Sequence, residues 1–109
     1  MKLQKKKIIA VINKDANLHG VYYRGTDKFC VIGGLLHYAK VNVRKLISPL
    51  DNQCSLSTMN RAVAYNIKSI LWKKYGINKN LAMELQSIND NHLTTQARRE
   101  ELVERVQED

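Results

Sequence analysis

Short runs of β-branched and aromatic residues occupy the first third of the chain. They cover residues 8–12, 18–24 and 28–32, and polar clusters rich in Asn, Asp and Gly separate them. Runs of this composition between turn residues are typical of strands. Because the connections are short, the three strands are predicted to pair as an antiparallel meander.

The pattern becomes helical after Gly33 and Gly34, which are expected to interrupt the last strand. Residues 35–39 are predicted to form a short apolar helix. Residues 56–75 place apolar side chains at steps of three and four, which is the spacing of one helix face. Shorter helices are expected over residues 81–88 and 94–106.

Capping residues support these boundaries. Ser55 or Ser57 can cap the long helix, and Gly76 follows it where a left-handed residue is favoured. Thr94 or Thr95 can cap the last helix. The chain is therefore predicted to be an α+β fold, a single domain over residues 1–109, with an N-terminal antiparallel β-meander followed by three to four α-helices.

Positive charge favours anionic partners. The formal net charge is +8 and the pI about 9.7, which attracts nucleotides and nucleic acids. No apolar run is long enough to span a membrane, and the basic N-terminus precedes too few apolar residues for a signal peptide. Cys30 and Cys54 lie outside any CxxC spacing, so reduced thiols and a cytoplasmic location without a membrane partner are expected.

Catalytic and metal-binding patterns are not evident in the sequence. His19, His37 and His92 lack the close spacing of zinc ligands. Cys30 stands in an apolar run, where burial raises a thiol pKa and disfavours a thiolate nucleophile. The chain is therefore predicted to be a non-enzyme with no cofactor and no metal.

Polar residues near the carboxyl end form the main candidate site. Asn89 and Asp90 follow one predicted helix, and Arg98 and Arg99 lie in the next. Amide, carboxylate and guanidinium groups can together bind a base and a phosphate. The alternative is structural, because a helix stop followed by a capped helix also needs polar residues.

Aromatic and glycine residues offer further contacts. Trp72 and Tyr75 could stack on a base beside the polar residues, and Arg24, next to two tyrosines, could do the same. For Arg24 the alternative is an ordinary sheet surface. Gly33 and Gly34 precede a predicted helix, where free amides could bind a phosphate or the glycines could serve packing alone.

Three segments together resemble a family of small phage proteins. They are residues 29–39, the Tyr75–Gly76 pair that ends a long helix, and residues 85–90 followed by Arg98 and Arg99. In this order, over roughly residues 29–105, the chain is similar to the anti-Thoeris sponges, which sequester cyclic ADP-ribose signals of bacterial immunity. The N-terminal strands have no counterpart in that resemblance, and Gly34 replaces a frequent alanine.

The resemblance implies a phage anti-defence protein that binds cyclic nucleotide immune signals without cleaving them. The ligands would be cyclic ADP-ribose isomers and, by analogy with some relatives, cyclic oligonucleotides. It implies a homo-oligomer with pockets between subunits. Asn89, Asp90, Arg98 and Arg99 would be the contacts, with Trp72 or Tyr75 beside the adenine.

Two other functions stay open from the sequence. The helix over residues 56–75 carries Arg61, Lys68, Lys73 and Lys74 and no acid, so it could lie on a phosphate backbone. The chain would then be a small basic nucleic-acid-binding regulator. A phage inhibitor that docks on a host protein would leave no motif.

Overall fold

The computed structural model describes residues 2–14, 22–23, 28–46, 56, 60–91 and 94–109. Six helices cover most of these residues, and their bounds are α1 Lys5–Lys14, α2 Val31–Tyr38, α3 Val43–Leu46, α4 Arg61–Tyr75, α5 Lys79–Asn91 and α6 Thr95–Glu108. Strand β1 (Tyr22–Tyr23) pairs antiparallel with β2 (Lys28–Phe29), with Tyr22 opposite Phe29. The fold is helical.

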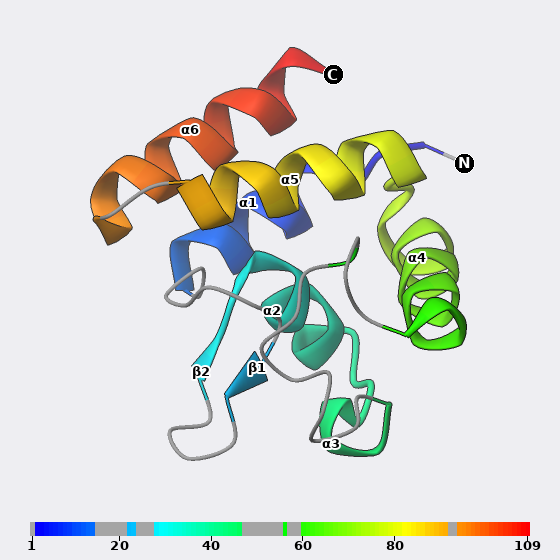
Figure 1. Cartoon of the computed structure of the whole chain (residues 1–109). Helices are drawn as coiled ribbons and strands as arrows, with labels where there is room; N and C mark the ends of the chain where they lie inside the picture. Colours follow the sequence, from blue (N-terminus) through cyan, green and yellow to red (C-terminus); the bar gives the residue numbers. More distant parts are fainter. Residues whose placement is uncertain (1, 15–21, 24–27, 47–55, 57–59, 92–93) are drawn as a thin grey trace.

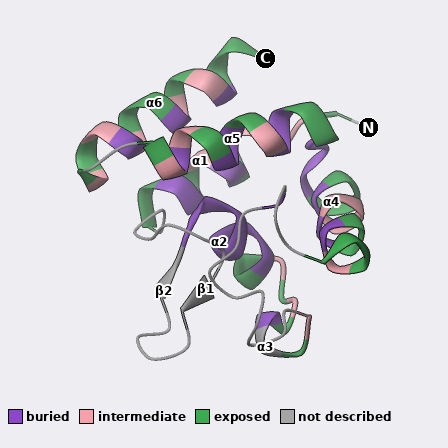
Figure 2. Ribbon diagram, viewed as in Figure 1, coloured by how far each residue is buried: buried purple, intermediate pink, exposed green. Residues whose placement is uncertain are grey.

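Helix α2 lies at the centre of this arrangement. It is contacted by α1, α4 and α5, while α5 and α6 pack side by side and α6 also contacts α1 (Figure 1). Every residue from Val31 to Leu36 is buried (Figure 2). The core therefore surrounds α2, and each outer helix packs one apolar face into this core.

The predicted α+β fold with an N-terminal β-meander is wrong. Residues 8–12, expected as the first strand, belong to α1, where Ile8, Val11 and Ile12 are buried. Their spacing of three and four residues places them on one helix face against α2 and α6. Packing of this face outweighs the β propensity of branched residues, which is a weak preference.

The described residues contain only short segments of the other two predicted strands. Within the described residues, the second and third runs contribute only the two-residue β1 and β2. Val31 and Ile32 belong to α2, and Gly33 and Gly34 continue that helix without interrupting it. Cys30 caps it, because its Sγ accepts a hydrogen bond from the Gly33 amide at 3.5 Å.

The later helices agree better with the sequence. Gly76 ends α4 in the left-handed conformation, with φ of 72° and ψ of 21°, and Thr94 caps α6, as predicted. Asn60 caps α4, so that helix begins later than residue 56. Ser55 and Ser57 lie outside the described residues.

Candidate functional site

The predicted site residues Asn89 and Arg98 are buried within the fold. Asn89 has 0% of its surface exposed, and its Oδ1 accepts a hydrogen bond from the Val31 amide at 3.0 Å. Its carbonyl oxygen accepts one from Arg98 Nε at 2.7 Å, and Arg98 is 3% exposed. These bonds join the start of α2, the end of α5 and the start of α6.

Asp90 extends this group, which we call the polar corner (Gln86, Asn89, Asp90 and Arg98). Gln86 Nε2 donates to both carboxylate oxygens of Asp90 at 3.2 and 3.1 Å, and Asn89 Nδ2 donates to Oδ1 at 3.3 Å. Gln86 is buried and Asp90 half-buried. The structure thus brings Asn89, Asp90 and Arg98 together, and their bonds within the fold favour the structural alternative.

Of the other predicted site residues that the structure describes, Arg99 contacts the end of α1, and Trp72 and Tyr75 lie on α4. Arg99 Nη2 donates to the Lys14 carbonyl at 3.3 Å, across to the end of α1. Trp72 is 43% exposed on α4, whereas Tyr75 on the same helix is buried. Arg24 lies outside the described residues. Ligand binding by all seven residues stays a prediction.

The amides at the start of α2 are bonded to protein atoms. The Val31 amide donates to Asn89, that of Gly33 to the Cys30 sulfur, and that of Gly34 to the Cys30 carbonyl at 2.9 Å. A phosphate would have to displace these buried partners. Packing is therefore the better interpretation of Gly33 and Gly34.

Cys30 is a buried free thiol that adjoins the polar corner. The pKa of its thiol is raised from 9.0 to about 12, mainly by burial and to a smaller extent by the negative charge of Asp90, while hydrogen bonds from the backbone of Gly33 and Ile32 act in the opposite direction. The prediction that burial raises the pKa of Cys30 and disfavours its thiolate is confirmed. Cys54 lies outside the described residues.

This pKa shift predicts a loss of stability at alkaline pH. Above 9.0 the unfolded chain releases the Cys30 proton while the folded chain retains it up to about 12, so the unfolding free energy falls across that window. The expected loss is about 1.4 kcal/mol for each pH unit within it. Denaturant unfolding at pH 8 and about pH 10 measures it.

The matched control is Cys30→Ala, which removes the titrating group. The variant should be less stable at pH 8, yet lose less on going to pH 10 than the parent chain. Equal alkaline losses in the two chains would show that Cys30 does not titrate as the structure implies.

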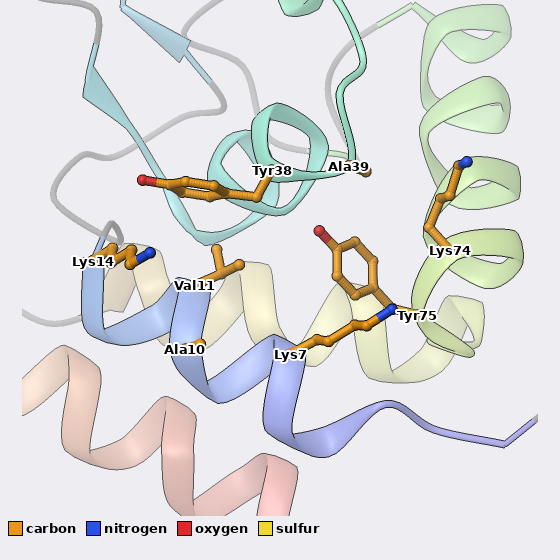
Figure 3. A pocket seen from close by; sticks show the side chains of 8 residues that line it. All are labelled: Lys7, Ala10, Val11, Lys14, Tyr38, Ala39, Lys74 and Tyr75. Atoms are coloured by element: carbon orange, nitrogen blue, oxygen red, sulfur yellow. The ribbon is translucent and has the colours of Figure 1, made fainter.

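A different part of the surface has the character of a ligand site. A hollow of about 310 Å³ lies between α1, α2 and α4, and we call it the lysine hollow (Figure 3). This volume is at the lower end of the range for ligand pockets. It is lined by Lys7, Ala10, Val11, Lys14, Tyr38, Ala39, Lys74 and Tyr75.

Three lysines and two tyrosines border an apolar floor in this hollow. Lys14 and Tyr38 lie at one end, and Lys7, Lys74 and Tyr75 at the other (Figure 3). Lys14 Nζ is 5.1 Å from the centre of the Tyr38 ring, and Tyr38 is 44% exposed. No acidic residue is among the lining residues.

Tyr75 fixes the wall of the lysine hollow. Its hydroxyl donates to the Leu35 carbonyl at 2.5 Å, which holds the ring between α4 and α2. Burial raises the pKa of Tyr75, so the hydroxyl stays neutral and adds no negative charge near the lysines. The hollow can therefore accept an anion that also carries a flat or apolar group.

The site predicted from the sequence did not include Lys7, Lys14, Tyr38 or Lys74, although Lys74 was considered as a contact to a phosphate backbone. Lys7 and Lys14 are seven residues apart, and they share a face only if residues 5–14 form a helix. Because residues 8–12 were predicted to form a strand, a shared face for Lys7 and Lys14 was not expected.

Comparison of the chain with family models, curated proteins and solved structures found no match. Among the residues that the structure describes, no helix has the length and apolar character needed to span a membrane. In the same part of the chain, no group of three or more His, Cys, Asp or Glu side chains is placed to hold a metal.

Proposed function

We propose that this chain binds a small phosphorylated ligand with an aromatic base and holds it without cleaving it. The lysine hollow is the single observation that supports this function. It combines three cations, an exposed ring and an apolar floor in one concave surface. Cyclic ADP-ribose isomers and cyclic oligonucleotides, the ligands implied by the sequence resemblance, have both chemical groups.

Each side of the hollow would take a different part of the ligand. The ammonium groups of Lys7 and Lys74 would bind phosphate, since lysine acts there as a point charge. The base would lie against Tyr38, whose ring is already held beside Lys14. No nucleophile or metal is required for this role, which is sequestration.

Assembly is part of the proposal because the hollow is open to solvent on one side. A second copy of the chain over Tyr38 would bury the base and strengthen the charge interactions by excluding water. Native mass spectrometry with and without ligand measures the number of subunits.

The test is calorimetry with cyclic ADP-ribose isomers, ADP and cyclic oligonucleotides on the parent chain and on Lys7→Glu and Lys74→Glu. A charge reversal removes about 1 kcal/mol of attraction and adds a similar repulsion, so each variant should bind about 10- to 30-fold more weakly. Mass spectrometry after denaturation should recover the ligand intact.

Lys6→Glu is the matched control, because Lys6 is exposed on α1 next to Lys7 but does not line the hollow. It makes the same charge change and should bind as the parent does. Ala10→Leu fills the floor without altering charge and should also weaken binding. Absence of heat with every ligand, or equal loss in Lys6→Glu and Lys7→Glu, would contradict the proposal.

A further inference from the structure

The outer face of α4 carries an aromatic and basic pattern that the lysine hollow does not use. Arg61, Tyr65, Lys68 and Trp72 follow one another at steps of four, three and four residues. At 3.6 residues per turn, these steps place all four side chains along one line of the helix. We call this line the α4 stripe.

Exposure distinguishes the α4 stripe from a core face. Tyr65 is 73% and Trp72 43% exposed, and Arg61 is exposed as well. The buried residues of α4 are Ala64, Ile67, Leu71 and Tyr75, which form a different face toward α2 and α5. Figure 2 shows α4 at the edge of the fold with exposed residues on its outer side.

Among the described residues that form α4 or line the hollow beside it, every charged side chain is basic. Helix α4 contains no acidic residue. A surface hollow of about 770 Å³ adjoins the stripe, and its lining includes Arg61, Tyr65 and Lys68 together with Lys79 of α5. The cations therefore extend from the start of α4 to the start of α5.

We propose that the α4 stripe binds single-stranded nucleic acid. Unpaired bases expose faces that stack on aromatic rings, and the backbone phosphates match the cations that lie between and beside those rings. Tyr65 and Trp72 are separated by roughly 10 Å along the helix axis. That distance equals about three base steps of one strand.

Other partners would use only part of this surface. An acidic peptide would engage the cations and leave the two rings uncovered. A membrane surface would require a broader apolar face than two separated rings. A base-paired duplex would present its phosphates but not its base faces. Of these partners, a single strand best matches both the exposed rings and the cations.

Trp72 is the single tryptophan of the chain, so its fluorescence reports on the α4 stripe directly. Oligothymidylate of about 20 nucleotides should quench this fluorescence, with an affinity that falls steeply between about 50 and about 200 mM salt. Inorganic polyphosphate carries the charge without bases and should not quench. Absence of quenching at low salt, or equal quenching by polyphosphate, would overturn the proposal.

Variants of the α4 stripe separate stacking from charge. By anisotropy of labelled oligothymidylate, Tyr65→Ala and Trp72→Ala should each weaken binding about five- to 100-fold. Lys68→Glu should weaken binding and lower the salt dependence by roughly the contribution of one phosphate contact. Both rings are exposed, so their replacement should leave the circular dichroism spectrum unchanged.

Lys6→Glu provides the matched control for this second surface. It should bind oligothymidylate within about two-fold of the parent chain, because Lys6 is exposed on α1 and lines neither the lysine hollow nor the hollow beside the stripe. If Lys6→Glu and Lys68→Glu lose affinity equally, the attraction is general to a basic protein and the α4 stripe is not a binding surface.

Discussion

Asn89→Ala is expected to lower the unfolding free energy by about 3 kcal/mol, which is a large part of the stability of a small domain. The substitution removes the side chain that accepts a hydrogen bond from the Val31 amide and donates one to the Asp90 carboxylate. The Val31 amide would then be buried without a partner, and a cavity would remain where the side chain was. Denaturant unfolding monitored by circular dichroism measures the loss.

Asn91→Ala is the matched control for that prediction. Asn91 lies two residues further along α5, is exposed, and donates to Ser87 Oγ at 3.3 Å. Its replacement should change stability by less than about 0.5 kcal/mol. Similar losses for both variants would show that the polar corner does not stabilise the junction of α2, α5 and α6.

Asn89→Asp separates hydrogen bonding from size. The new carboxylate is close in shape but introduces a charge, buried beside Asp90. Burial and the like charge should both raise its pKa, so the variant should be strongly destabilised near pH 7. The loss should shrink as the pH falls through that raised pKa and the group becomes neutral.

The helices that could be predicted from sequence are those with a periodic apolar face, and a cap helped to place the ends of some of them. Leu102 and Val106 of α6 are buried as their spacing predicts, and Thr94 caps that helix. Residues 8–12 show why the amino-terminal part could not be predicted. A run of five apolar residues fits either period, and only packing against α2 and α6 selects the helix.

The candidate site could also be predicted only in part, because contacts between distant segments decide its environment. Proximity of Asn89, Asp90 and Arg98 followed from a short connection between two helices. Their burial did not, because it depends on the Val31 amide, which lies 58 residues from Asn89 along the chain. Likewise, the lysine hollow combines α1 with α2 and α4, and no local pattern joins Lys7 to Lys74.

Gly76→Ala is expected to destabilise the fold by about 2–4 kcal/mol, or roughly 10 °C in melting temperature. Gly76 has φ of 72°. For any L-residue that carries a Cβ, this backbone conformation is unfavourable in free energy. A Cβ at this position would also lie 2.5 Å from the Lys2 carbonyl oxygen and 2.9 Å from its carbon. The chain before α1 would have to move, which threatens the bond from the Gln4 amide to the Tyr75 carbonyl at 2.8 Å.

Gly76→Asn divides this effect into its two causes. Asparagine tolerates the left-handed region better than alanine but carries the same Cβ. If the approach of Lys2 is the main cause, the Asn and Ala variants should lose similar stability. If backbone conformation is the main cause, Gly76→Asn should recover about 1 kcal/mol. A Gly76→Ala chain within about 0.5 kcal/mol of the parent would contradict both, and would place Lys2 farther from the end of α4 than the structure does.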